Sequence, residues 1–304
     1  MAWLFTFAGV VLVLFVLRDV FHTLWHPTRH GGLSRLVMRA VWRLSALRGT
    51  RWRSAGLAGP LGMVTVVAVW ALTVAVGWGL VYWPHMPEGF SYAPGLDPAE
   101  HAGPVDALYL SLVTLATLGL GDIAPTSGWL RALAPVEALV GFVLLSATVA
   151  WILGIYPALA RRRALALRLS HVRRGPATAR AIDSGGGAAL LDGLASALST
   201  ITVDFLQYAE SYYFYDGDAN TSLPGQLGYA TDLANRSASA RHPDVRLSAA
   251  VLRTALDDLA TVLDERFLRT GGTPERVFAA YAADHGRARV GPDGPPRRHG
   301  GGRS

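Results

Sequence analysis

Three long apolar segments constrain the fold of this chain more than any other feature of its sequence. They run over residues 2–25, 61–83 and 130–157. Each is long enough to cross a bilayer, which takes about 20 apolar residues. The first contains Arg18 and Asp19 near its end, the second is uncharged, and the third contains one acid, Glu137. The sequence therefore predicts an all-α membrane protein with three transmembrane helices.

Composition limits the classes of function that the chain can have. Its 304 residues allow about two domains, and 16% of them are charged, against roughly a quarter in soluble proteins. The absence of cysteine excludes disulfides and thiolate metal sites. We find no paired carboxylates, nucleophilic triad, metal-ligand spacing or nucleotide-binding glycine motif. We therefore expect a protein that is not an enzyme, has no cofactor and binds no nucleic acid.

The distribution of arginine predicts the orientation of the segments. Residues 26–60 and 161–180 each contain seven arginines and no acid, whereas residues 84–130 contain five acids and no arginine. Loops rich in arginine stay on the cytoplasmic side of a membrane. We therefore expect a multi-pass protein of the cell membrane with its N-terminus outside, residues 84–130 outside and its C-terminal half in the cytoplasm. The first segment lacks the basic start and the cleavage site of a signal peptide, so we expect it to remain as a helix.

A glycine-containing hexapeptide lies in the outward connection, after the short apolar segment 107–116. It reads Thr117-Leu118-Gly119-Leu120-Gly121-Asp122. Glycine lets carbonyl groups point in directions that other residues resist, and rings of carbonyls can replace the water shell of a cation. A re-entrant helix from outside directs its partially negative C-terminal end toward the membrane centre. One such loop cannot enclose a path, but several copies around an axis can, and we expect four.

Residues 106–125 resemble the pore helix and filter of tetrameric potassium channels, whose pattern is Thr-Val-Gly-Tyr-Gly-Asp. The resemblance covers residues 61–157. It implies passive potassium conduction by a homotetramer, with a re-entrant pore helix and filter in each subunit. It also implies an N-terminal cap at Asp106, an outward turn at Gly121 and a place for Asp122 at the outer mouth. The permeant K⁺ would bind the carbonyls of Thr117, Leu118, Gly119 and Leu120, with one further oxygen from the hydroxyl of Thr117.

The sequence departs from the family pattern at two places. Leu120 stands where the family has tyrosine or phenylalanine, with no tryptophan in the pore helix, and Ala116 stands where the family often has threonine. Leucine cannot donate the hydrogen bond that a tyrosine hydroxyl or tryptophan indole makes, so we expect apolar packing alone to hold the filter and selectivity to be less strict. Two alternatives stay open, a weakly selective monovalent cation channel and a non-conducting membrane sensor or scaffold with the channel fold.

Four residues of the third apolar segment are candidates for gating. Gly141 stands where the family has a hinge glycine, and packing between helices is its other interpretation. Gly154 and Pro157 lie near the predicted cytoplasmic end, where the inner helices of four subunits could cross. Glu137 is an intramembrane acid and therefore a functional candidate. It either hydrogen-bonds the backbone behind the filter or lies partly wet at the interface.

Residues 33–47 predict an amphipathic helix on the inner leaflet. Arg35, Arg39 and Arg43 recur at a spacing of four, close to anionic lipid headgroups. The segment is too short and too charged to span the membrane as a voltage sensor.

The C-terminal half predicts a cytoplasmic helical domain. We expect helices at about 188–214, 223–239, 245–268 and 274–285. We expect residues 1–60 to form the first transmembrane helix and a basic loop, and residues 61–160 to form the pore module. Residues 161–187 should form a basic helix with a Gly185-Gly186-Gly187 linker. Residues 188–285 should form the helical domain, and residues 286–304 a disordered tail. Whether the domain senses a ligand, binds a partner or assembles the tetramer stays open.

Overall fold

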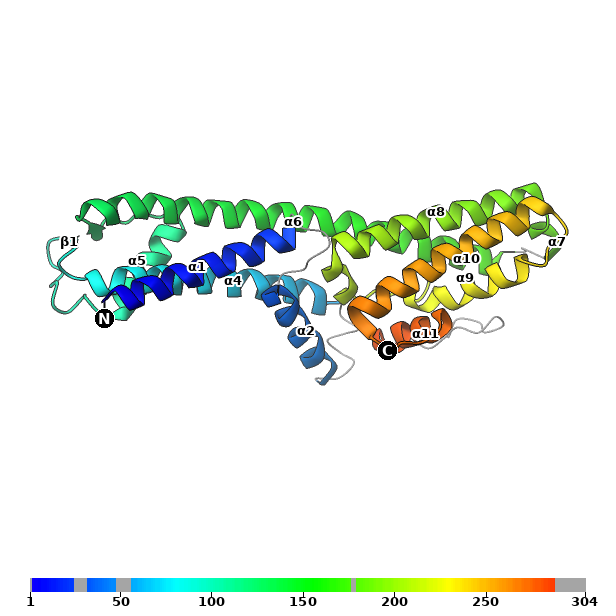
Figure 1. Ribbon diagram of the computed structural model, residues 1–304, viewed down its shortest axis with the longest axis horizontal. Helices are drawn as coiled ribbons and strands as arrows, with labels where there is room; N and C mark the ends of the chain where they lie inside the picture. Colours follow the sequence, from blue (N-terminus) through cyan, green and yellow to red (C-terminus); the bar gives the residue numbers. More distant parts are fainter. Residues whose placement is uncertain (1, 25–31, 48–55, 176–178, 288–304) are drawn as a thin grey trace, which may run out of the picture. The chain divides into compact units, whose positions relative to one another are not determined.

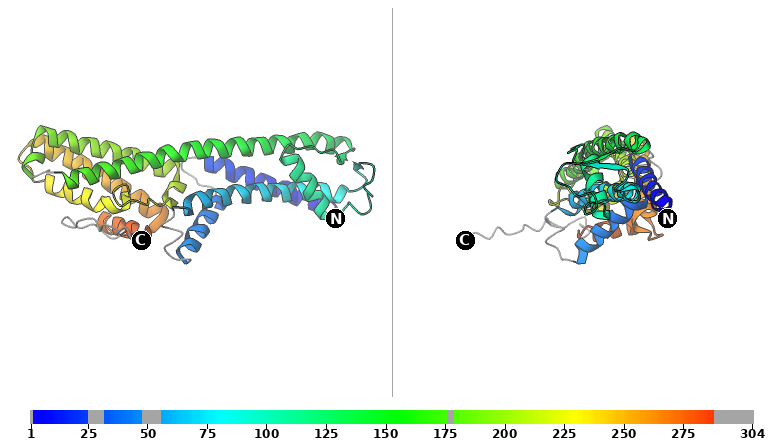
Figure 2. Two further views of the ribbon diagram at one scale, coloured as in Figure 1. Left: turned by 180° about the vertical axis from the view of Figure 1, so that it is seen from behind. Right: turned by 90° about the vertical axis from the view of Figure 1, so that its left-hand side faces the viewer.

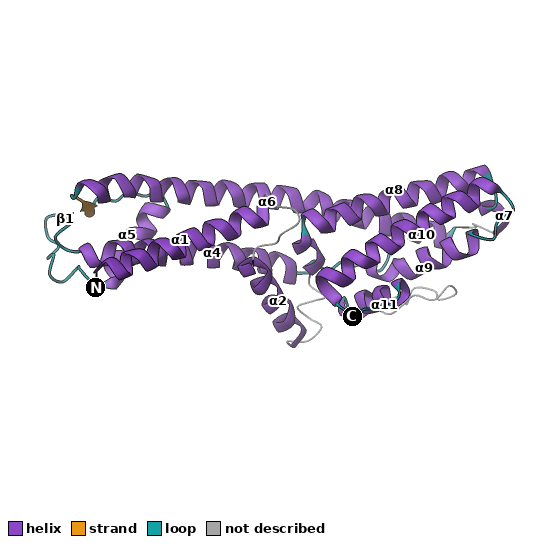
Figure 3. Cartoon of the chain, in the orientation of Figure 1, coloured by secondary structure: helices purple, strands orange, loops and turns teal. Residues whose placement is uncertain are grey.

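The structure, a computed structural model, describes residues 2–24, 32–47, 56–175 and 179–287. Figure 3 shows that helices form most of these residues. The chain divides into two compact units, the first made of Met1–Arg43 and Leu61–Gly154 and the second of Leu44–Pro60 and Ile155–Ser304. The described residues include four helices that are long and apolar enough to cross a membrane, one more than predicted. These are Ala2–Thr23, Ala58–His85, Gly128–Arg174 and Gly185–Gln207.

The first unit is built mainly from five helices. They are α1 (Ala2–Leu24), α2 (Gly32–Leu47), α4 (Ala58–Tyr82), α5 (Pro104–Leu115) and the first part of α6 (Gly128–Arg174). The short helix α5 lies between α4 and α6 (Figures 1 and 2). A Cβ atom on Gly79 of α4 would be 3.4 Å from the Cα of Leu108 in α5, so the two helices are in close contact.

A small antiparallel sheet lies at the ends of these helices. Strand β1 (Phe90–Tyr92) follows α4, and strand β2 (Ile123–Pro125) follows the hexapeptide. Phe90 pairs with Pro125 and Tyr92 with Ile123. The sheet therefore fixes the chain that leaves the hexapeptide against the chain that leaves α4.

Small residues bring α1 and α4 together. A Cβ atom on Gly9 would be 2.3 Å from the carbonyl oxygen of Gly77, and one on Gly77 would be 2.7 Å from Cγ2 of Val13. Any larger residue at Gly9 would meet backbone, which cannot move away as a flexible side chain can. This close approach through glycine is a typical way for membrane helices to associate.

The carboxylate of Asp19 holds the N-terminus of α2. It accepts hydrogen bonds from the backbone N–H groups of Leu33 and Ser34, at 3.0 and 3.1 Å, and from the indole of Trp70 at 2.9 Å. The first N–H groups of a helix have no partner within it, and the positive helix end favours a carboxylate. Asp19 thereby joins α1, α2 and α4.

The predicted amphipathic character of α2 is confirmed. Ser34, Met38 and Trp42 are buried on one face, whereas Arg35 and Arg43 are exposed. Contact of this arginine face with anionic lipid stays a prediction.

The second unit is a helical bundle that includes the later part of α6. Its elements are α7 (Ala179–Ile182), α8 (Gly185–Gln207), η2 (Ala209–Tyr213), α9 (Leu223–Ser237), α10 (Pro243–Leu263), η3 (Asp264–Leu268) and α11 (Pro274–Asp284). Helices α8 and α10 lie side by side (Figure 1). The apolar stripe that the sequence shows on α10 is buried throughout, at Val245, Ala249, Leu252, Leu256, Leu259 and Leu263. This confirms it as a core-facing surface.

Two predictions about this half of the chain are wrong. The glycines of the predicted linker form the first turn of α8, because Ser184 accepts a hydrogen bond from the N–H of Gly187 at 3.3 Å and caps the helix. Glycine is required at position 187, where a Cβ atom would be 1.8 Å from the carbonyl oxygen of Ile182. The first long helix ends at Gln207 rather than Phe214, since Tyr212 is instead stacked on Phe267, with ring centroids 4.2 Å apart. Most of the predicted tail, 288–304, lies outside the described residues.

Three consecutive arginines bind α6 to the rest of the second unit. Arg161 makes a bidentate ion pair with Asp204, with N···O distances of 2.6 and 2.8 Å. Arg162 is buried and donates to the carbonyls of Ser211 and Phe214, at 2.7 and 2.9 Å. Asp216 accepts from both Arg162 and Arg163, at 3.1 and 2.8 Å. The prediction that α6 continues through this basic run is confirmed, since the helix ends at Arg174.

Arg162→Ala should lower the melting temperature of the full-length protein in detergent far more than Arg163→Ala. The side chain of Arg162 is 3% exposed and that of Arg163 is 45% exposed, although both bind Asp216. Removing one partner of a buried ion pair costs about 3–5 kcal/mol, and an exposed pair contributes about 0–1 kcal/mol. Equal shifts for the two variants would contradict the structural role assigned to Arg162.

Candidate functional site

The hexapeptide begins in a turn that ends α5. The N–H of Thr117 donates to the carbonyl of Thr114, and the N–H of Leu118 donates to the carbonyl of Val113, both at 2.9 Å. This pair of hydrogen bonds around a left-handed residue is a Schellman motif, in which glycine is the usual residue. Thr117 occupies the left-handed position with a φ of 57°. A β-branched residue there is strained, and such strain is found where the surrounding structure and function require it.

The backbone of the hexapeptide alternates between two conformations. Thr117, Gly119 and Gly121 have positive φ angles of 57°, 53° and 78°, and the leucines between them do not. Alternation of left- and right-handed residues directs successive N–H groups to one side of a chain and leaves the carbonyls on the other. A Cβ atom on Gly119 or Gly121 would meet nothing within 4 Å. The glycines are therefore needed for their φ angles and not for space within one chain.

The C-terminal end of the hexapeptide is fixed by Asp122. Its carboxylate accepts a hydrogen bond from the hydroxyl of Tyr109 in α5 at 2.6 Å, and its carbonyl accepts one from the N–H of Ala93 at 2.8 Å. The expectation that apolar packing alone holds this segment is therefore wrong. Tyr109 supplies a polar anchor that the sequence analysis missed. Its place on the helix directly before the hexapeptide, thirteen residues before Asp122, is the sequence feature that could have indicated this contact.

Glu137 of α6 lies behind α5 and is completely buried. One carboxylate oxygen accepts a hydrogen bond from the hydroxyl of Tyr82 in α4, and the other accepts one from the hydroxyl of Ser111 in α5, both at 2.5 Å. The partly wet interpretation of Glu137 is therefore wrong. Its hydrogen-bond partners are the side chains of Tyr82 and Ser111 and not the backbone behind the hexapeptide. One carboxylate thus joins α4, α5 and α6.

Gly141 lies one turn after Glu137 and touches the end of α5. A Cβ atom there would be 1.9 Å from the carbonyl oxygen of Leu115, the last residue of α5. The packing interpretation of Gly141 is supported, with α5 rather than α4 as the partner. Gly154 and Pro157 lie within α6, which continues past both. The roles of these residues in gating stay predictions.

Asp106 occupies the third position of α5. Its carboxylate accepts a hydrogen bond from the N–H of Gly103, the residue before the helix, at 3.1 Å. It thereby stabilises the start of α5, as the capping role predicts. Across the described ranges, no group of three or more histidine, aspartate or glutamate side chains could hold a metal ion.

Part of the chain matches a known protein family. Residues 64–156 match the family described as ion channel. This range holds α5, the hexapeptide and the residues of α6 up to Tyr156. The match supports the resemblance to the potassium channel family that the hexapeptide carries.

Two curated proteins are similar to parts of the chain. The uncharacterized membrane protein YdjJ of Bacillus subtilis (strain 168) is 25% identical over 169 residues, which are 54% of this chain and 48% of that protein. Two-pore potassium channel 5 of Arabidopsis thaliana is 46% identical over 55 residues, which are 17% of this chain and 14% of that protein. The chain thus spans about half or less of the length of these relatives. No solved structure matches it.

Tyr82→Phe should destabilise the full-length protein, whereas Tyr92→Phe should not. The first change removes a hydrogen bond to a buried carboxylate, which contributes about 1.5–3 kcal/mol. The hydroxyl of Tyr92 is buried without a hydrogen-bond partner among the described residues, so it is a matched control in the same unit. Melting temperatures in detergent test this. Equal stability of Tyr82→Phe and the wild type would contradict the bridging role of Glu137.

Proposed function

We propose that the chain is the pore-forming subunit of a homotetrameric cation channel that prefers potassium. The observation that carries this proposal is the alternation of positive and negative φ angles along the hexapeptide, which fits a backbone with consecutive carbonyls on one side of the chain. Four such chains around an axis would make rings of oxygens from Thr117, Leu118, Gly119 and Leu120. Rings of this kind replace the hydration shell of K⁺ without the aid of charged side chains.

The proposed topology has three spans per subunit, α1, α4 and the first part of α6, with α5 re-entrant from outside. The fourth apolar helix, α8, is better assigned to a cytoplasmic bundle. Asp204 of α8 pairs with Arg161, Asp192 is exposed, and Leu191, Leu194 and Leu198 are buried in the second unit. A helix with two acids and an already covered apolar face has no reason to enter lipid. The arginine distribution then places the N-terminus outside and the C-terminal half inside.

Apolar side chains that are exposed in a single chain support the assembly of several chains. Leu118 and Leu120 are 65% and 61% exposed. On α6, Phe142, Leu145, Val149 and Leu153 are also exposed. Exposed apolar surface of this extent marks contacts with lipid or with other subunits. In a tetramer, the hexapeptide leucines would pack behind the carbonyl rings, and the α6 residues would face lipid or the neighbouring subunits.

Selectivity depends on how firmly the hexapeptide is held. Leu120 cannot donate a hydrogen bond, and this favours a weakly selective cation channel as the second candidate function. Tyr109 supplies the polar anchor that Leu120 lacks, through its hydrogen bond to Asp122. A filter anchored at both ends favours potassium as the preferred ion.

The proposed gating elements follow from the contacts of α6. Gly141 and Glu137 connect α6 to α5. A movement of α6 would therefore displace α5 and the start of the hexapeptide. Gly154 and Pro157 would mark the cytoplasmic part of the inner helix, where a gate could form.

Recording from purified full-length protein in planar bilayers tests the function directly. Under opposing K⁺ and Na⁺ gradients, we expect a reversal potential near that of K⁺. Gly119→Ala should abolish the current, because alanine is strained at a positive φ. Gly95→Ala is the matched control, since Gly95 also has a positive φ with nothing within 4 Å but lies outside the hexapeptide.

Three outcomes of this recording would contradict the proposal in different ways. A current that is unchanged in Gly119→Ala would exclude the hexapeptide as the pore. A reversal potential at zero would favour the weakly selective channel. A folded tetramer without current would favour the sensor or scaffold.

Tyr109→Phe should weaken the filter without abolishing conduction. The change removes the hydrogen bond to Asp122 and keeps the aromatic ring. We expect current to decline several-fold faster during sustained recording, with a smaller preference for K⁺ over Na⁺. Tyr92→Phe, which loses a hydroxyl without a described partner, should behave as the wild type. An unchanged time course in Tyr109→Phe would show that the anchor is dispensable.

A further inference from the structure

Helix α2 has an exposed face on which arginine and apolar side chains alternate. Arg35, Leu36, Ala40 and Arg43 are exposed, at spacings that place them on one side of a helix. Leu36 is 65% exposed. Helix α2 contains no acid, and in the described part of the chain no ion pair involves Arg35 or Arg43. The described chain therefore offers this cationic face no partner of opposite charge.

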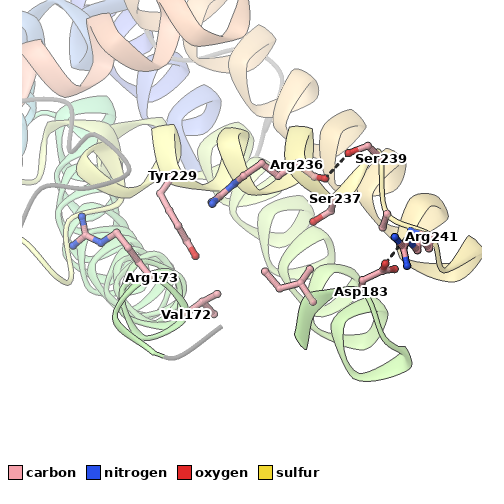
Figure 4. A pocket seen from close by; sticks show the side chains of 10 residues that line it. Val172, Arg173, Asp183, Tyr229, Arg236, Ser237, Ser239 and Arg241 are labelled. Atoms are coloured by element: carbon pink, nitrogen blue, oxygen red, sulfur yellow. Dashed lines mark hydrogen bonds between the residues drawn. The ribbon is translucent and has the colours of Figure 1, made fainter. Parts of the chain in front are cut away.

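Several arginines of the second unit are arranged differently. Arg161 and Arg162 are paired with acids of that unit. Others line a pocket, but Figure 4 shows Arg173 and Arg241 on opposite sides of it, with Arg173 directed away from Ser237. Guanidinium groups that diverge in this way cannot act together on one anion, whereas those of α2 lie on one surface.

The opposite face of α2 is packed against α4. A Cβ atom on Gly62 of α4 would be 2.7 Å from Sδ of Met38 and 3.9 Å from Cγ1 of Val41, so the two helices are in direct contact. Met38 and Trp42 are buried on this face. These contacts fix the rotation of α2 about its axis and direct its arginine face away from α4.

One carboxylate oxygen joins the start of α2 to α4. Oδ2 of Asp19 accepts hydrogen bonds from the backbone N–H of Ser34 at 3.1 Å and from the indole N–H of Trp70 at 2.9 Å. Asp19 and Trp70 are 5% and 2% exposed, so water has little access to these bonds. A displacement of the start of α2 therefore either moves Trp70 or leaves a buried carboxylate with fewer donors, which is costly.

Trp70 also contacts α6, on which Trp151 lies. The centroids of the two indole rings are 5.6 Å apart, and their planes are inclined by 39°. Aromatic rings at this separation attract each other. Both side chains are 2% exposed. A continuous series of contacts thus runs from the start of α2 through Asp19 and Trp70 to α6.

We propose that α2 docks on a bilayer surface of anionic headgroups through Arg35 and Arg43. Asp19 and Trp70 transmit the docked position of α2 to α6 at Trp151. A surface that favours one position of α2 shifts the population of α6 toward the matching arrangement. An effect on conduction rests on the proposed channel function, but docking and its transmission to α6 do not.

The side chains of the exposed face identify the bilayer as the partner. Guanidinium groups match the phosphate oxygens of headgroups. Leu36 and Ala40, which lie between the arginines, suit the boundary between headgroups and acyl chains. The arginine-rich connection that contains α2 is predicted to be cytoplasmic, and the cytoplasmic surface of a membrane carries negative charge.

A spin label on α2 tests the docking. The chain contains no cysteine, so Ala40→Cys in the full-length protein gives a single labelled site. The probes are vesicles of phosphatidylcholine alone and vesicles of equal amounts of phosphatidylcholine and phosphatidylglycerol. We expect the accessibility of the label to a water-soluble nickel complex to fall about three-fold in the anionic vesicles, because their charge draws α2 toward the headgroups. Equal accessibility in the two kinds of vesicle would overturn the proposal.

Arginine variants assign this change to the exposed face. Arg35→Gln combined with Arg43→Gln should abolish the difference between the two kinds of vesicle. Arg253→Gln, which changes an exposed arginine of α10, should leave it intact. A label that is shielded equally in both vesicles, whatever the arginines, would show that protein rather than anionic lipid covers α2.

A second label tests the transmission to α6. Leu153 is exposed and lies two residues beyond Trp151, so Leu153→Cys reports on that part of the helix. We expect the spectrum of this label to differ between the two kinds of vesicle. Trp70→Phe should abolish the difference, because it keeps a ring but removes the donor to Asp19. Trp78→Phe should preserve it, since the indole N–H of Trp78 has no hydrogen-bond partner among the described residues.

The two labels together separate the possible failures. A Leu153 label that does not respond to the anionic lipid, or that still responds in Trp70→Phe, would overturn the transmission. Docking of the Ala40 label in Trp70→Phe shows that the variant is folded, so the lost response then comes from the removed hydrogen bond. Absence of current from protein in which both labels respond would count against the channel function alone.

Discussion

The buried carboxylate of Glu137 is the contact on which the geometry of the first unit depends. A carboxylate among apolar helices is costly unless its oxygens accept hydrogen bonds. Tyr82 and Ser111 supply one donor to each oxygen, from α4 and α5. These two bonds set the rotation and depth of α5 between its neighbours. Gly141, one turn further along α6, then lets the last carbonyl of α5 approach the α6 backbone. The contacts of α5 with α4 and α6 therefore fix the position at which the hexapeptide begins.

The backbone of the hexapeptide is held at its two ends and not in its middle. The Schellman turn fixes its N-terminal end at Thr117, and Tyr109 and the β1–β2 pairing fix its C-terminal end at Asp122. Gly119 has no neighbour that a Cβ atom would meet. A strained residue such as Thr117 persists only where its surroundings over-determine it. The two anchors thus sustain an alternating backbone that a free loop would relax.

The features that were predictable from the sequence are those that depend on local pattern. The apolar segments, the glycine spacing of the hexapeptide and the buried stripe of α10 follow from composition and periodicity. The polar contacts were not predictable, because Tyr82, Ser111 and Glu137 are separated by 29 and 26 residues and meet only through packing. The Gly185 to Gly187 run was misread for a related reason. Glycine indicates a linker unless a close approach such as that at Ile182 is known.

Pairing distinguishes the roles of the arginines on α6. Arg161, Arg162 and Arg163 meet the acids Asp204 and Asp216, so their charges are neutralised within the second unit and they hold the helix in place. Two turns and more beyond them, Nη1 of Arg173 is buried without a hydrogen-bond partner among the described residues. The same helix therefore has one set of arginines that the second unit holds through ion pairs and, further along, one arginine that the described acids do not hold.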